Sequence, residues 1–307
     1  MPFRQTDEDV SFLVGVAEHR VLTRGQTARL LGRNLAALGR RLPALEAAGL
    51  VRTVVRGFRA RRGRPEGLVS LAEKGVELLK EKGCLKPEVP ARRVLSVEPQ
   101  ETEHQLLTNE FRVQLEEMVR RAPVLSVQFL SANSPFLARS AGDDPVVRER
   151  FRASGTADEW VEFTPDGVFR LTHSELRKTL LFFLEVDRGT EPVTTSKGTR
   201  EAICRKIANY QAYCTAGRYK RYEGMWNCTL KQFRLLLLTQ TATGLAALCR
   251  LVQQMDGTGF VWLTDEQRLK SAGVWGAIWA RGRGFRGQPQ SILGSQAPIL
   301  LPSLGPP

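Results

Sequence analysis

The sequence predicts an α+β protein of two domains, and three observations support that prediction. Its 307 residues exceed the roughly 100–200 residues of one compact domain. Hydrophobic residues make up 42% and charged residues 25%, which is typical of a folded chain. Helical apolar spacing dominates the N-terminal part, whereas strands and helices alternate further on. We expect a helical domain over 1–85, a linker over 86–101, a mixed α/β domain over 102–265, and a C-terminal extension over 266–307 that is largely disordered after 281.

The N-terminal domain is predicted to consist of three helices, a hairpin and a closing helix. A helix follows the acidic residues at 7–9, and a second begins near Thr23. Asn34 can cap a third helix, in which Pro43 bends the helix or shifts its start. A strand then leads into a basic loop at Arg59–Arg64, and a returning strand precedes a helix from Ala72.

Positive charge is concentrated in this domain. The chain has 45 Lys and Arg against 32 Asp and Glu, a net charge of +13, and residues 20–65 hold twelve Arg and a single acid, Glu46. This imbalance favours a polyanionic partner, although an arginine-rich, GC-rich genome also explains the total. The order of helices and hairpin resembles a winged helix-turn-helix. The third helix would then enter the major groove of double-stranded DNA, and the hairpin would reach a phosphate or the minor groove. A winged helix that pairs only with protein stays open. The candidate DNA-binding residues are Arg33, Arg40, Arg41, Arg59, Arg61, Arg62 and Arg64.

Carboxylates mark the second domain. After a polar segment over 132–160, predicted to be a long loop, the chain reads Pro165-Asp166-Gly167 and then a strongly apolar strand that ends in Glu185 and Asp187. Glu185 and Asp187 share a face because strand side chains alternate with period two. Three carboxylates that converge at a sheet edge suit Mg²⁺ or Mn²⁺, which would activate water and stabilise phosphate charge.

This spacing, together with the order of helix, three strands, helix and strand, resembles the PD-(D/E)xK nucleases and their restriction-endonuclease-like fold. The resemblance implies that Asp166 and Glu185 are the two carboxylates of the motif. It also places Asp187 where the motif requires lysine, so Lys206 on the next helix is the candidate substitute. The alternative is a structural ion pair in a domain that kept the fold and lost catalysis. The candidate catalytic residues are Asp166, Glu185, Asp187 and Lys206, and the candidate metal ligands are Asp166, Glu185 and Glu110.

Four segments carry a narrower resemblance: EHQLLTNEFRVQLE, TPDG, FFLEVDRGTEP and KIANYQAY. With the winged helix they are similar to the replication-relaxation family of bacterial plasmid and mobile-element proteins, over residues 8–265. The resemblance implies a role in plasmid replication or DNA relaxation. Two functions stay open. One is a DNA-binding replication or mobilisation factor with metal-dependent nuclease activity. The other is a non-catalytic transcriptional regulator whose second domain dimerises or senses a ligand.

Other protein classes are disfavoured. No run reaches the roughly 18–20 apolar residues of a membrane helix. The five cysteines contain no CxxC pair, which disfavours a zinc site or a disulfide framework and indicates a reducing cytoplasm. No GxxxxGK[ST] sequence for ATP binding occurs. The expected partners are double-stranded DNA and a second copy of the chain, without a membrane.

Overall fold

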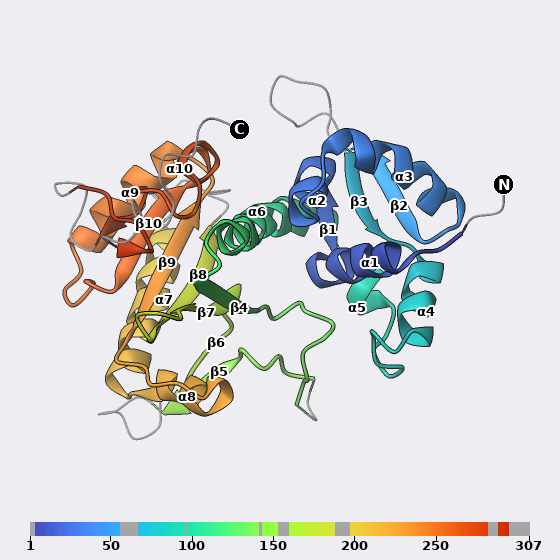
Figure 1. Cartoon of the computed structure of the whole chain (residues 1–307). Coiled ribbons are helices and arrows are strands. Elements are labelled where there is room, and N and C mark those ends of the chain that lie inside the picture. Colours follow the sequence, from blue (N-terminus) through green and yellow to red (C-terminus); the bar gives the residue numbers. More distant parts are fainter. Residues whose placement is uncertain are drawn as a thin grey trace. The chain divides into compact units, whose positions relative to one another are not determined.

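The computed structural model describes residues 4–55, 67–95, 97–140, 143–152, 160–187, 197–281 and 288–294 (Figure 1). Helices and β-sheets are both present, so the predicted mixed class is confirmed. The chain divides into two compact units, Met1–Val113 with Asn133–Ala138 and Gln114–Ala132 with Arg139–Pro307. Among the described residues, no helix is both long and apolar enough to cross a bilayer.

The first unit is built on a three-stranded sheet with helices around it (Figure 1). Strand β3 is central and pairs antiparallel with β1 and with β2. In chain order the elements are α1 (Asp7–His19), β1 (Val21–Thr23), α2 (Arg24–Leu30), α3 (Leu35–Ala47), β2 (Val51–Val55), β3 (Gly67–Leu71), α4 (Glu73–Glu81), α5 (Arg92–Leu95) and the long α6 (Pro99–Arg121), which continues into the second unit.

Side-chain caps explain where the first three helices begin. Thr6, Thr23 and Asn34 each accept a hydrogen bond from the backbone N–H three residues later, at 3.2, 3.1 and 2.7 Å. Each cap satisfies one N–H that has no acceptor inside its helix. Helix α3 runs through Pro43 without a break, so the proline does not shift its start.

Residues 86–101 are not a linker, in contrast to the sequence prediction. They contain α5 and the start of α6, and Val89 and Val94 are buried in the same apolar cluster as Leu13 and Leu79. The prolines of this segment disrupt any regular spacing, so its few buried side chains leave no periodic signal. The first unit therefore extends well past the predicted boundary at residue 85.

The second unit is built on a six-stranded sheet of order β11-β10-β9-β8-β7-β4. Strands β8, β9 and β10 are parallel, and the remaining pairs are antiparallel. In chain order the elements are β4 (Leu125–Leu130), β5 (Glu149–Arg152), β6 (Trp160–Phe163), β7 (Gly167–His173), β8 (Lys178–Asp187), α7 (Lys197–Thr215), η1 (Arg218–Lys220), α8 (Arg221–Trp226), β9 (Phe233–Thr239), α9 (Ala242–Gln253), β10 (Val261–Asp265), α10 (Glu266–Ala272) and β11 (Ala280–Arg281).

Two further predictions for this unit are wrong in part. The segment 132–160 is not one long loop, because β5 pairs with β6 and the buried Glu149 accepts a hydrogen bond from Tyr222 at 2.8 Å. The chain after 281 is not disordered throughout: Gln290 exchanges two backbone hydrogen bonds with Trp279, and Ile292 is buried. Residues 282–287 and 295–307 lie outside the described part of the chain.

Candidate functional site

The turn before β7 places Asp166 beside the end of β8. Gly167 pairs with Leu184, and Asp166 Oδ2 accepts a hydrogen bond of 2.7 Å from the backbone N–H of Val186. A Cβ at Gly167 would lie 2.1 Å from the Phe129 ring, so any larger residue would require that ring to move. The Asp-Gly pair thus allows the strand to pass under an aromatic ring while its carboxylate reaches the neighbouring strand.

Glu185 is the centre of this group of residues. Its side chain is buried, with Oε2 2.6 Å from Lys206 Nζ and Oε1 2.7 Å from the Tyr210 hydroxyl, which donates to it. Burial raises the pKa of Glu185, the charge of Asp166 raises it further, and Lys206 acts in the opposite direction. Burial lowers the pKa of Lys206, but the charge and hydrogen bond of Glu185, together with the charges of Asp166 and Asp187, outweigh it and leave that pKa above its ordinary value.

All four candidate catalytic residues therefore lie at the carboxyl end of β8. Lys206 comes from α7, and the charges of Glu185, Asp166 and Asp187 all act on it. The cation therefore comes from α7, whereas the nuclease motif would place a lysine at position 187, which is an aspartate in this chain. Tyr210 was not predicted as a partner of Glu185. It lies four residues after Lys206, so the helical period puts both on one face of α7.

Glu110 has a different role from the one predicted. It is buried in the first unit, where its Oε1 accepts from Arg29 at 2.7 Å and its Oε2 accepts from Gln26 at 3.3 Å. Asp166 and Glu185 belong to the second unit. Within the described ranges there is no group of three or more His, Cys, Asp or Glu that could hold a metal. The predicted three-ligand set is therefore reduced to two carboxylates.

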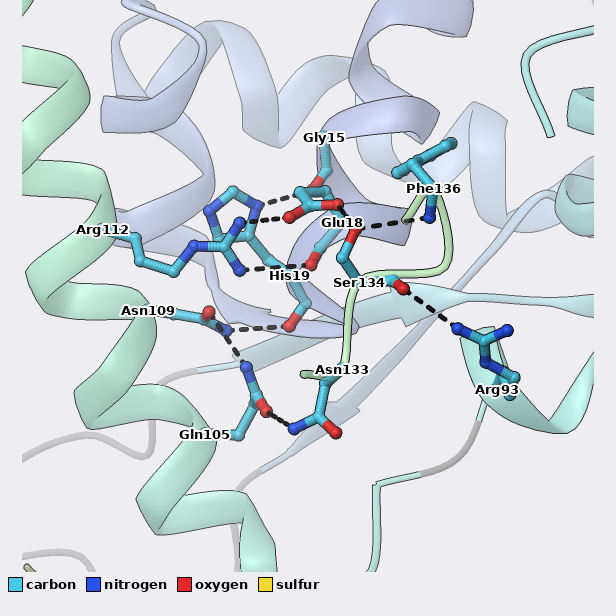
Figure 2. A network of polar contacts seen from close by, with 10 residues as sticks. All are labelled: Gly15, Glu18, His19, Arg93, Gln105, Asn109, Arg112, Asn133, Ser134 and Phe136. Atoms are coloured by element: carbon cyan, nitrogen blue, oxygen red, sulfur yellow. Dashed lines mark hydrogen bonds and ion pairs between the residues drawn. The ribbon is translucent and has the colours of Figure 1, made fainter. Parts of the chain in front are cut away.

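Polar residues of α6 form a cluster inside the first unit, which we call the α6 polar cluster (Figure 2). Asn109 is buried, and its Nδ2 donates to the carbonyls of His19 and Val21, at 2.9 and 2.6 Å. Arg112 donates to Glu18 at 2.5 Å, and Glu18 also accepts from Ser134. The motif EHQLLTNEFRVQLE therefore holds the end of α1 and the start of β1, a role that its helical periodicity does not reveal.

Helix α3 separates its arginines. Leu38, Leu42 and Leu45 face the core, and Arg40 is on the exposed side, where no described residue forms an ion pair with it. Arg41 instead binds Asp9 through Nε at 2.8 Å and through a terminal nitrogen at 2.5 Å.

Arg41, a predicted DNA contact, has a partner within the protein, because its guanidinium neutralises a buried carboxylate. Arg33 is exposed and pairs with the exposed Glu8 at 2.5 Å. The hairpin arginines Arg59, Arg61, Arg62 and Arg64 lie outside the described residues.

The chain belongs to the replication-relaxation family, whose sequence pattern it matches over residues 13–228. No curated protein matches it significantly. A mutant of ZitR from Lactococcus lactis in apo form aligns at 28% identity, over 26% of this chain and 56% of that one, with a TM-score of 0.22. A mutant of MepR from a multidrug-resistant S. aureus clinical isolate aligns at 20% identity, over 38% and 79%, with a TM-score of 0.24. This chain therefore spans little more than half of that ZitR chain.

Proposed function

We propose that the protein binds double-stranded DNA through its first unit, as part of plasmid or mobile-element replication or relaxation. The main observation is the order α1-β1-α2-α3-β2-β3-α4 around the sheet β1-β3-β2, which is that of a winged helix. The β2–β3 connection, residues 56–66, contains five arginines and one acid in the sequence. Membership of the replication-relaxation family supports the biological setting.

The outer face of α3 suits a close approach to a groove. Leu35, Ala36, Gly39 and Arg40 are all exposed. A Cβ at Gly39 would meet nothing within 4 Å, so no packing constraint explains a glycine that costs about 1 kcal/mol in a helix. A bare helix surface lets the backbone come near a partner. Arg40 lies beside it as the candidate contact to a base edge, where a bidentate contact discriminates by about 1–3 kcal/mol.

Binding is tested by fluorescence anisotropy on a labelled duplex between about 50 and 200 mM salt. Replacing Arg59, Arg61, Arg62 and Arg64 with Ala should flatten the plot of log affinity against log salt, by about 0.9 for each phosphate that the variant no longer neutralises. The control is Arg250→Ala, an exposed arginine on α9 of the second unit. An unchanged slope in the folded quadruple variant would remove the hairpin from the interface.

Arg40 is tested on a selected binding site and on a random duplex. Arg40→Ala should weaken binding to the selected site by about ten- to a hundredfold and affect random DNA much less. Equal losses on both duplexes contradict base readout and leave Arg40 as a phosphate contact.

The second candidate function is metal-dependent cleavage of DNA by the second unit. Without β5, β6, η1 and α8, its order α6-β4-β7-β8-α7-β9 resembles that of a restriction-endonuclease-like core, and Lys206 brings a cation within 2.6 Å of Glu185. Two convergent carboxylates are sufficient for Mg²⁺, which one or two carboxylates and substrate phosphates commonly hold. Asp166 and Glu185 would hold Mg²⁺ or Mn²⁺, and the bound ion would supply water activation and phosphate charge stabilisation. Lys206 would orient Glu185 and balance its charge.

Cleavage is tested by nicking of supercoiled plasmid with Mg²⁺ or Mn²⁺. Asp166→Asn and Lys206→Met should abolish it, whereas Glu175→Gln, an exposed acid between β7 and β8, should not. Absence of nicking by the wild-type protein refutes the nuclease proposal. Equal nicking by Asp166→Asn assigns the activity to another source.

A further inference from the structure

The second unit contains a cavity of about 260 Å³ on the sheet face opposite Glu185. Lys178 and Leu180 line it from β8, and they alternate with the face that carries Glu185. Leu180 is only half-buried although it is apolar and lies in an interior strand of the sheet. The other lining residues are Leu125, Leu171, His173, Leu176, Arg234, Trp262, Ile292, Leu293 and Gly294. Most of this lining is apolar.

Arg234 gives the cavity a cationic end without a bound acid. Its guanidinium lies 4.8 Å from the centre of the Trp262 ring, and no carboxylate in the described part of the chain pairs with it. Burial lowers the pKa of Arg234, and the nearby charge of Arg281 lowers it further. Lys178 and His173 add two more basic side chains to the lining. A half-buried cation among basic neighbours is costly unless an anion joins it.

Trp262 forms the wall of the cavity next to Arg234. Its side chain is buried, and its Nε1 has no hydrogen-bond acceptor among the described residues. A buried indole N–H normally finds a partner. This nitrogen is closed to solvent, so a ligand in the cavity cannot reach it, and Trp262 contributes to the site through the ring beside which Arg234 lies.

We propose that this cavity binds a small amphipathic organic anion: a monocarboxylate whose apolar body lies against Leu171 and Leu180 and whose carboxylate is held by Arg234. The volume is just below the roughly 300–1,000 Å³ of most ligand sites, so the ligand is a short aliphatic or aromatic acid and not a lipid or a peptide. The apolar lining argues against a nucleotide phosphate, which would need polar partners around several oxygens. The inference is independent of DNA binding and of nuclease activity.

The test uses the full chain, with octanoate as the anionic probe and octanamide as its uncharged counterpart, in isothermal titration calorimetry. Octanoate should bind at least tenfold more tightly than octanamide, and Arg234→Gln should remove that preference. Arg250→Gln, an exposed arginine outside the cavity, is the matched control. Leu180→Trp should fill the cavity and reduce binding of both probes.

Arg234→Gln should also raise the melting temperature of the protein without ligand, because it removes an unpaired, half-buried charge. This result shows that the variant is folded when its affinity falls. Failure of octanoate to bind, equal affinity for the two probes, or unchanged octanoate binding by Arg234→Gln would each overturn the proposal.

Discussion

Asn109→Ala should destabilise the first unit by about 2–4 kcal/mol. The Asn109 side chain is fully buried and donates to two backbone carbonyls, those of His19 and Val21. Each hydrogen bond contributes about 1 kcal/mol net, and a buried polar group left without a partner costs about 1–3 kcal/mol. Asn109→Asp should cost more at neutral pH, because it places a carboxylate oxygen against the same two carbonyls. Burial would raise the pKa of the new carboxyl, so its stability should recover as the pH falls.

The positions of the aromatic residues allow the two units to be followed separately. All five tryptophans, at 160, 226, 262, 275 and 279, belong to the second unit. Tryptophan fluorescence therefore reports that unit, while far-UV circular dichroism reports both. In urea, Asn109→Ala should move the dichroism transition to lower concentration and leave the midpoint of the fluorescence transition in place.

The control is Glu116→Ala, an exposed position on the same helix. It should change neither transition by more than about 0.5 kcal/mol. A loss below that size in Asn109→Ala would mean that water replaces the two hydrogen bonds. The α6 polar cluster would then not hold the first unit together.

Three further predictions concern charge and packing. Burial alone would raise the pKa of Asp9, but its hydrogen bonds lower it, so its contribution to stability is full above the ordinary value of 3.8 and is lost as the pH falls. Asp9→Asn should therefore destabilise the first unit at pH 7, and the difference from wild type, followed by dichroism, should shrink in acid. Lys206→Met leaves Glu185 buried without its cation. The second unit should lose stability at pH 7 and regain part of it toward pH 4.5. The reason is that burial raises the pKa of Glu185, so this carboxyl becomes neutral, and ceases to destabilise the folded state, as the pH falls toward its ordinary pKa. A loss of stability that does not change with pH, followed by tryptophan fluorescence, would contradict this. Gly75→Ala should destabilise the first unit strongly, because the new Cβ would lie 2.2 Å from a backbone oxygen, whereas Gly39→Ala should stabilise it by up to about 1 kcal/mol in the same urea titration.

Secondary structure was predictable wherever local chemistry determines it. The second helix begins at Thr23 and Asn34 caps the third as expected, because a cap needs only a side-chain oxygen and an N–H three residues away. The buried strand β8 has an unbroken apolar run, as strands covered on both faces do. By contrast, β5 and β6 were missed because Glu149 is a charged residue in a buried position. Tyr222 and Arg221, some seventy residues away in sequence, are among the residues that make that position favourable.

The candidate site was likewise predictable only where local rules determine it. Strand alternation and the turn at Asp166 were enough to predict that Asp166 lies near Glu185, because both are local rules applied to adjacent strands. Periodicity, however, cannot tell which part of the protein a helical face contacts. Glu110 was therefore assigned to the metal, although Arg29 of the first unit neutralises it. The pairing of Arg41 with Asp9 was missed for the same reason, since the two residues are distant in sequence.

The two proposed activities depend on cations in different ways, and this makes them separable in one protein. Binding by arginines releases counterions from the phosphate backbone, so it weakens with salt but needs no divalent ion. Cleavage by Asp166 and Glu185 needs a divalent ion, because two carboxylates alone repel a phosphodiester. A chelator should therefore leave DNA affinity intact while it abolishes nicking. The hairpin variants should lose affinity, and an unassisted second unit should still be able to nick DNA slowly at high protein concentration. Loss of both activities on chelation would instead mean that the metal supports the fold of the DNA-binding surface, a role that the two-carboxylate site in the second unit does not explain.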